Sequence, residues 1–103
     1  NLILLSVGAV GFISVCGHTV GNQLKAMLTA WFAGDSKKAL EIHQQLLPVF
    51  IGTFRTQGAI LSKAGLTLMG LPGGHTRLPL VDATDEQIKQ LKIDLQQGGV
   101  KLI

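Results

Sequence analysis

The sequence contains no tyrosine and has one cysteine, one tryptophan and four phenylalanines among 103 residues. Only 15% of the residues are charged, whereas 47% are hydrophobic. A single cysteine excludes an internal disulfide and supplies no zinc-ligand pair, which is typical of a reducing, cytoplasmic compartment. The low charge leaves little polar surface, so we expect part of the apolar surface to face a partner segment. Because Asn1 is not an initiator methionine, we expect a piece of a longer protein.

Long runs of charge are also missing. Nine basic and six acidic residues give a net charge of +3, and no basic run is longer than Lys37-Lys38. With so few aromatic residues to interleave with the bases, nucleic-acid binding is not expected. The histidines do not lie about three to five residues apart, so no metal site is predicted; they are His18, His43 and His75. Cys16 lies in an apolar stretch, which we interpret as a buried, inert thiol.

No charged side chain occurs in the first 24 residues, which raises the question of a membrane segment. A spanning helix needs about 20 apolar residues, and a secretory signal needs a basic segment before its apolar core. Here glycines interrupt the run and polar residues follow Cys16, so we expect no membrane span. We predict instead a helix over residues 2–7, a turn at Gly8 and a strand over residues 10–15 that is buried on both faces of a parallel sheet. Such a strand needs neighbours, and the chain contains no second convincing strand.

The rest of the chain predicts helices. Apolar residues at three- and four-residue spacing predict one helix from Leu24 that ends near Gly34. Asp35 or Ser36 can cap the next helix, which contains Pro48 and is expected to bend there. On its apolar face, His43 is interpreted as a packed, hydrogen-bonded core histidine.

Two further helices complete the prediction. One covers residues 59–69, and a glycine- and proline-containing loop follows it. The spacing of Thr84 and Gln87 predicts a capping box at the start of the other, which frays near Gly98.

Standard catalytic motifs are absent: we find no phosphate-binding loop, no dinucleotide fingerprint, no G-x-S-x-G turn and no H-E-x-x-H. Lys63 lies in the apolar stretch ILSKAGL, where burial could lower the pKa of an amine and prepare a Schiff-base nucleophile. The alternative is a helical lysine that buries its stem and extends its ammonium to water, which we favour.

Several motifs together carry a resemblance to a known family. Residues 8–15 read GAVGFISV; Ala33-Gly34-Asp35, a Leu-Leu-Pro within a helix, Lys63-Ala64 and Arg-Leu-Pro-Leu at residues 77–80 follow in order. This order is similar to the carboxy-terminal third of the dihydrodipicolinate synthases, within the wider family of pyruvate-dependent class I aldolases. The resemblance covers nearly all 103 residues.

The resemblance implies a mainly α chain that forms the carboxy-terminal portion of a (β/α)8 barrel protein. Residues 1–34 would be the end of the barrel (end of helix seven, strand eight and helix eight), and residues 35–103 a helical appendage. Ile13 would contact bound pyruvate, although a residue of this kind can also be ordinary barrel filling. The Schiff-base lysine would precede Asn1, so Lys63 would not be the nucleophile and this chain alone would be inactive.

The same resemblance implies a lyase of lysine and diaminopimelate biosynthesis that condenses pyruvate with aspartate semialdehyde, uses no metal or other cofactor, and forms a homo-oligomer. One departure keeps the substrate open, because family members often read Asn-Pro-x-Pro-x-Lys where this chain reads QGAILSK. An N-acetylneuraminate lyase or keto-deoxy-sugar aldolase is one alternative. An independent helical module that binds a protein partner is another.

Overall fold

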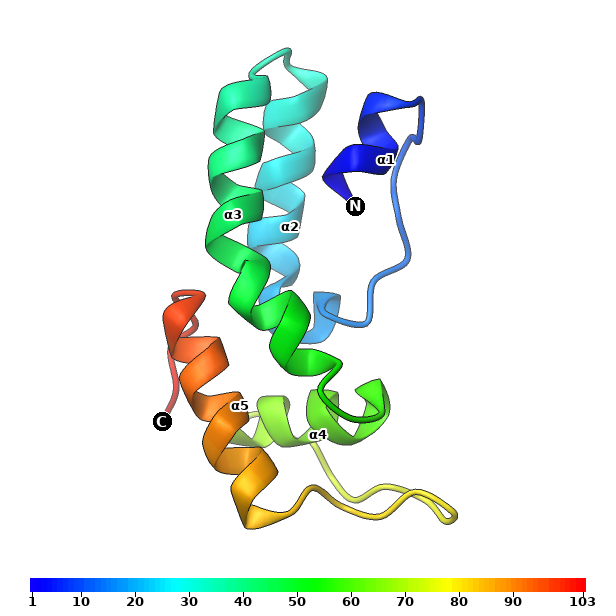
Figure 1. The fold of residues 1–103 in the computed structure, drawn as a ribbon, viewed down its shortest axis with the longest axis vertical. Coiled ribbons are helices and arrows are strands. Elements are labelled where there is room, and N and C mark those ends of the chain that lie inside the picture. Colours follow the sequence, from blue (N-terminus) through cyan, green and yellow to red (C-terminus); the bar gives the residue numbers. More distant parts are fainter.

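The computed structural model describes residues 1–103 and contains five helices and no strand. The helices are α1 (Leu2–Ser6), α2 (Gly17–Phe32), α3 (Ser36–Thr53), α4 (Gly58–Leu68) and α5 (Asp85–Gln97). Helices α2 and α3 form an antiparallel hairpin, α5 lies along the lower part of α3, and α4 crosses below (Figure 1). The chain is elongated, with principal extents of 42 × 26 × 21 Å. None of the helices combines the length and apolar character needed to cross a membrane.

The sequence signals at the helix ends act as predicted. The Asp35 carboxylate accepts a hydrogen bond from the Lys38 backbone N–H at 2.9 Å, which caps α3. At α5 the capping box is complete: Thr84 Oγ1 accepts from the Gln87 N–H at 3.2 Å, and Gln87 Oε1 accepts from the Thr84 N–H at 3.0 Å. These bonds satisfy backbone donors that have no partner within the helix.

The core lies between α2, α3, α4 and α5. Its largest fully buried side chains are Met27, Leu46, Leu61, Leu91, Leu95, Val20 and Val49. Burying each one stabilises the fold by about 1.5–3 kcal/mol relative to exposure. Helix α3 continues through Pro48, as its sequence predicted, and changes direction in its lower half (Figure 1).

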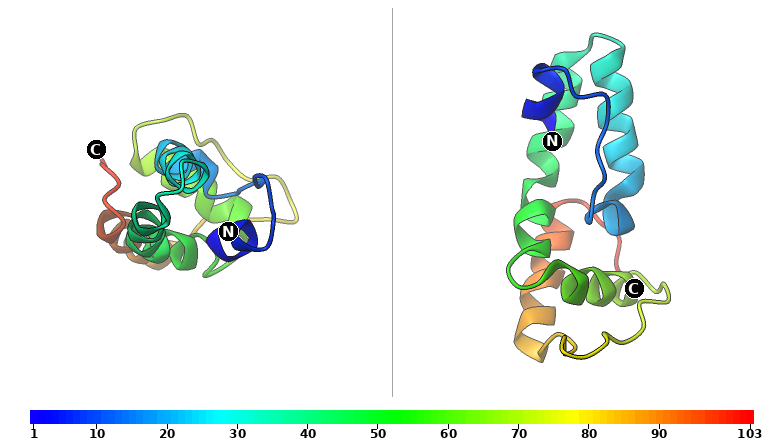
Figure 2. Two further views of the ribbon diagram at one scale, coloured as in Figure 1. Left: turned by 90° about the horizontal axis from the view of Figure 1, so that it is seen from above. Right: turned by 90° about the vertical axis from the view of Figure 1, so that its right-hand side faces the viewer.

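The strand predicted for residues 10–15 is absent from this chain. Residues 9–14 have no regular secondary structure, and this segment runs from α1 down to the start of α2 (Figure 2). The backbone N–H groups of residues 10–16 donate to no backbone carbonyl. A strand is held by hydrogen bonds to neighbouring strands, and this chain supplies no neighbour. Its apolar sequence therefore takes an irregular path.

Candidate functional site

The segment that contains Ile13 has one face against the helices and one face open. Cys16 is buried and Phe12 packs against the core, whereas Ile13 is fully exposed. Successive side chains of an extended chain point to opposite sides, which explains this alternation over residues 11–16. No side chain of this chain covers Ile13, so its open face can line a site formed together with other residues.

The carboxy end of this segment contacts the helices at Gly58. A Cβ added to Gly58 would lie 3.1 Å from Phe54 Cε1 and 3.3 Å from Val15 Cγ1. Gly58 is the first residue of α4, and Phe54 follows the last residue of α3. The missing side chain at Gly58 therefore lets α4 approach closely. Three segments of the chain meet at this point.

Cys16 and His43 illustrate how burial changes side-chain chemistry. Cys16 is buried as expected, and burial raises the pKa of its thiol. Burial also lowers the pKa of His43, whose ring centroid lies 5.7 Å from that of Phe50. The prediction that His43 is hydrogen-bonded is wrong for its Nδ1 atom, which is buried and has no hydrogen-bond partner. Its ring packs by apolar contact instead. No three His, Cys, Asp or Glu side chains come together to hold a metal ion.

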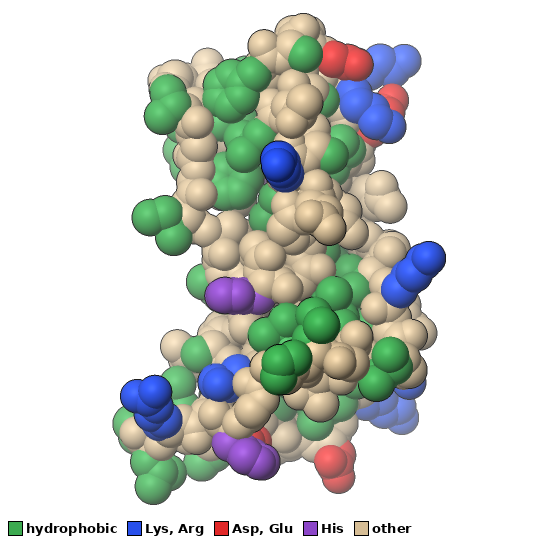
Figure 3. Space-filling view, turned by 180° about the vertical axis from the view of Figure 1, so that it is seen from behind, with side chains coloured by type: hydrophobic (Ala, Val, Ile, Leu, Met, Phe, Trp, Pro, Cys, Tyr) green, Lys and Arg blue, Asp and Glu red, His purple; other side chains and the backbone are tan.

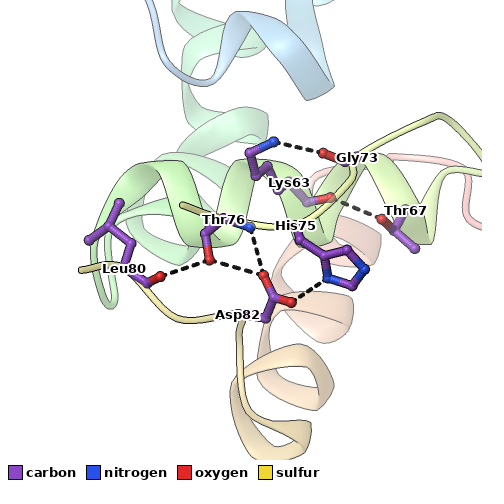
Figure 4. Close-up of polar contacts among 7 residues, drawn as sticks. All are labelled: Lys63, Thr67, Gly73, His75, Thr76, Leu80 and Asp82. Atoms are coloured by element: carbon purple, nitrogen blue, oxygen red, sulfur yellow. Dashed lines mark hydrogen bonds and ion pairs between the residues drawn. The ribbon is translucent and has the colours of Figure 1, made fainter. Parts of the chain in front are cut away.

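Lys63 tethers the loop that follows α4. Its Nζ donates a hydrogen bond to the Gly73 carbonyl at 3.0 Å (Figure 4). A Cβ at Gly73 would overlap the Lys63 carbonyl oxygen, so only glycine allows the loop to lie this close. The stem of Lys63 is half-buried, as the favoured interpretation expected. Its ammonium, however, binds a backbone carbonyl and positions a loop.

The same loop is closed by a polar cluster that the sequence did not reveal. Asp82 accepts from the Thr76 N–H at 2.8 Å, from Thr76 Oγ1 at 3.0 Å and from His75 Nδ1 at 2.5 Å (Figure 4). These contacts, led by the Thr76 N–H, lower the pKa of Asp82 to about 2. The cluster therefore holds the loop between α4 and α5 in one shape. His75 and Asp82 are seven positions apart in the sequence, a spacing that matches no catalytic motif.

An ion pair that sequence reasoning missed joins the turn after α3, at Arg55, to Asp94 of α5. Arg55 donates through Nε to Asp94 Oδ2 at 2.7 Å and through Nη2 to Asp94 Oδ1 at 3.0 Å. The Asp94 side chain is buried and also accepts from Gln90. The guanidinium lowers the pKa of Asp94, and burial opposes this shift. The pair is thus a two-bond clamp between elements far apart in the sequence.

Taken together, the structure does not bring Ile13 and Lys63 into a common reactive cluster. Ile13 is on the open face of the segment, while the Lys63 ammonium is committed to Gly73. The chain contains an exposed apolar side chain at Ile13 and several polar clusters that join its own segments. It offers no nucleophile with an adjacent base, which is the arrangement that covalent catalysis requires.

Comparison with known proteins gives a consistent result. Residues 1–98 match the Dihydrodipicolinate synthetase family. The chain is 61% identical over 102 residues to 4-hydroxy-tetrahydrodipicolinate synthase 2 of Streptomyces coelicolor, covering 99% of this chain and 34% of that protein. It is 55% identical over 99 residues to the synthase of Acidothermus cellulolyticus, covering 96% of this chain and 32% of that protein.

Solved structures agree. The crystal structure of dihydrodipicolinate synthase from Thermotoga maritima superposes with a TM-score of 0.90 at 33% identity, covering 95% of this chain and 33% of that one. The predicted fold class, a mainly α carboxy-terminal portion of a (β/α)8 barrel protein, is confirmed. The chain spans about a third of the length of the relatives that it matches. It belongs to the dihydrodipicolinate synthetase family.

Proposed function

We propose that this chain is the carboxy-terminal part of a 4-hydroxy-tetrahydrodipicolinate synthase, in which residues 1–34 complete the barrel and residues 35–103 form a helical appendage. The observation that carries the proposal is the collinear family match over residues 1–98. The 61% identity to the Streptomyces coelicolor enzyme supports the same substrates. We place the whole protein in the cytoplasm as a homo-oligomer.

In the proposed reaction, pyruvate condenses with a lysine that lies outside this chain, and the resulting imine loses a proton to give an enamine. The enamine carbon then attacks the aldehyde carbon of aspartate semialdehyde, whose oxygen takes up a proton and becomes a hydroxyl group. The amino group of the former semialdehyde adds to the imine carbon, and the lysine leaves as a free amine while the heterocyclic ring closes. Positioning of the two substrates in an enclosed pocket contributes as much as the nucleophile. This chain contributes to the enclosure.

Ile13 is the residue of this chain that we assign to the pyruvate site. Its side chain projects from the face of the segment that no helix covers. In (β/α)8 barrels the reactive groups lie at the carboxy ends of the strands, and Ile13 lies toward that end of the predicted strand. An exposed isoleucine there would contact the pyruvate methyl group and exclude water.

A chimera tests the proposed activity in a complete protein. We would replace the matching segment of the Streptomyces coelicolor enzyme with this chain, hereafter the chimera. We expect it to be labelled by borohydride in the presence of pyruvate and to condense pyruvate with aspartate semialdehyde. A folded chimera that cleaves N-acetylneuraminate instead, or that does neither, would overturn the proposal.

The assignment of Ile13 is tested in the same chimera. We expect Ile13→Asp to raise the Michaelis constant for pyruvate about tenfold or more, because a carboxylate replaces an apolar contact and repels the pyruvate carboxylate. Ile103→Asp, at another exposed isoleucine, is the matched control and should leave this constant unchanged. An unaltered Michaelis constant in a folded Ile13→Asp variant would remove Ile13 from the site.

A further inference from the structure

The turn between α3 and α4, residues 54–57, is held to its surroundings at both ends. At its first end, Arg55 donates two hydrogen bonds to the carboxylate of Asp94 on α5, at 2.7 and 3.0 Å. At its second end, the side chain of Gln57 accepts a hydrogen bond from the Ala59 N–H at 2.7 Å and caps α4. Because both ends are bonded, this short turn has little freedom to change shape.

The clamp between Arg55 and Asp94 is part of the contact between α3 and α5. Only 3% of the Asp94 side chain is exposed. A Cβ at Gly52 would lie 2.6 Å from the Asp94 Cβ, so α3 carries glycine where this side chain approaches it. Gln90, one turn earlier on α5, donates a further hydrogen bond to the carboxylate at 3.2 Å. Since a buried carboxylate needs such partners, the guanidinium of Arg55 has one favoured position.

The same turn leads directly into the contact with the segment that carries Ile13. Gly58 follows the turn and begins α4, and a Cβ added to it would lie 3.3 Å from Val15 Cγ1. Side chains two positions apart in an extended chain point to the same side, so Val15 lies on the same face of the segment as Ile13. The turn therefore ends at a contact with this face, two positions from the residue assigned to pyruvate.

We propose that Arg55 and Asp94 are positioning residues of the pyruvate site: their clamp fixes the α3–α4 turn, and the turn fixes the segment whose Ile13 contacts pyruvate. This inference rests on the proposed function and deepens it. Both hydrogen bonds of the guanidinium go to Asp94, so Arg55 acts through the fold and not on the substrate carboxylate. A displacement of about 1 Å in a contact residue is enough to weaken a site.

The test uses the chimera with variants of both partners. Asp94→Asn keeps the shape of the side chain but removes its charge and one of its two acceptor atoms. Arg55→Met keeps the apolar stem and removes the guanidinium, and a double variant removes both partners. Ala39→Gly is the matched control, because Ala39 is buried near the opposite end of α3 and this change destabilises the helix without touching the turn.

Three quantities are measured well below the melting temperature of each variant. The first is the pyruvate concentration that gives half the maximal rate of borohydride labelling, which reports on imine formation alone. The second is the Michaelis constant for each of the two substrates. The third is the melting temperature, which reports on the structural contribution of the clamp.

We expect Asp94→Asn and Arg55→Met each to raise the half-labelling concentration and the Michaelis constant for pyruvate about three- to tenfold. The Michaelis constant for aspartate semialdehyde should stay within about twofold, because Ile13 is assigned to pyruvate. The double variant should show no larger increase than either single one, since the two partners form one clamp. Ala39→Gly should lower the melting temperature and leave both Michaelis constants unchanged.

Other outcomes contradict the inference. If the chimera is active and the clamp variants lose stability but bind pyruvate as the parent does, the clamp is purely structural and the proposed function stands. Equal changes in both Michaelis constants, or the same change in Ala39→Gly, would also show a general effect of stability. Where Arg55→Met does not fold, Arg55→Lys keeps the charge without the two-bond fork and is judged by the same criteria. A folded chimera that fails to label with pyruvate overturns the proposed function, and this inference with it.

Discussion

Gly98 shows that the absence of a side chain can determine how closely two helices pack. It follows the last residue of α5, and a Cβ there would overlap Val49 Cγ2 on α3. Because valine is stiff about its Cα–Cβ bond, the two helices would have to separate. We expect Gly98→Ala to reduce the free energy of unfolding by about 1–3 kcal/mol, measured as a lower melting temperature of the chimera.

The control for this prediction is another glycine. Gly21 is inside α2, and a Cβ on it would meet no atom within 4 Å. Alanine is the better helix former, so Gly21→Ala should leave the melting temperature unchanged or raise it, by a gain of about 0.5–1 kcal/mol. If both alanine variants behave alike, the close contact at Gly98 does not limit the packing of α5.

Asp94 connects stability to pH. Its pKa is lowered from the ordinary 3.8, mainly by the hydrogen bonds from Arg55. A carboxyl group with a lowered folded-state pKa stabilises the fold above its unfolded pKa, and this contribution is lost as the pH falls through the folded value. We expect Asp94→Asn to cost about 1–2 kcal/mol at pH 7, reduced by the partial exposure of Arg55.

The pH dependence provides the check. Urea unfolding of the chimera and its Asp94→Asn variant should show a difference that is constant above about pH 5 and shrinks below pH 3.8. Glu41 pairs with Lys38 at 3.7 Å on an exposed face of α3, so Glu41→Gln is the control and should cost less than about 0.5 kcal/mol. A difference that persists unchanged into acid would mean that the clamp does not depend on the Asp94 charge.

At the scale of elements, the features that could be predicted correctly from the sequence are those that depend on residues close together in the chain. A cap depends on residues three positions apart, so Asp35 and the Thr84–Gln87 box could be predicted from the sequence. The clamp between Arg55 and Asp94 joins residues 39 positions apart, and no local pattern indicates it. Helix α2 also begins at Gly17, well before the apolar stripe from Leu24, and the buried Val20 lies at a kink between its first turn and the rest of the helix.

For the candidate site, too, the local sequence pattern was not sufficient to make an assignment. Ile13 could be assigned only from the resemblance, because its sequence context is that of any buried strand. The spacing of Phe54 fits the apolar face of α3, yet 58% of it is exposed in this chain.

The segment before α2 allows a prediction about the missing strand. Its N–H groups at residues 10–16 have no backbone acceptor in this chain, whereas a barrel would supply neighbouring strands. We expect these amides to exchange hydrogen for deuterium rapidly in the isolated chain and at least about 100-fold more slowly in the chimera. Amides at Leu24 and Met27, in the buried part of α2, are the internal control for folding.

The opposite result is informative as well. Slow exchange of residues 10–16 in the isolated chain, at a protein concentration where it is monomeric, would mean that the segment finds partners within the chain. Rapid exchange in an active chimera would show that the barrel does not pair with it.

At the scale of the whole molecule, this chain exposes more surface than its mass requires. Its accessible surface is 6562 Å² for 10.9 kDa, whereas a folded monomer of that mass exposes about 5,600 Å². The radius of gyration is 14.3 Å, against about 13 Å for a compact domain of this length. Figure 3 shows hydrophobic side chains exposed over the upper part and the middle of one side, among scattered charges.

Part of the exposed surface is apolar. Large hydrophobic side chains that are more than half exposed occur in α1, in the segment that follows it and on α3; these are Ile3, Leu4, Val7, Val10, Ile13 and Ile51. Apolar patches of this kind are characteristic of surfaces that another part of a protein covers. In the proposed enzyme, the rest of the barrel would cover α1 and the segment.

The isolated chain should therefore associate with copies of itself. We expect sedimentation to show a mass that rises with concentration, since contact between copies is the available way to bury these side chains. Changing both Ile3 and Val10 to aspartate should shift the equilibrium toward monomer, while changing Lys25 and Lys89, on exposed faces of α2 and α5, to aspartate should not. A chain that stays monomeric at high concentration would contradict this argument, because the exposed apolar face would then be stable in water without any partner.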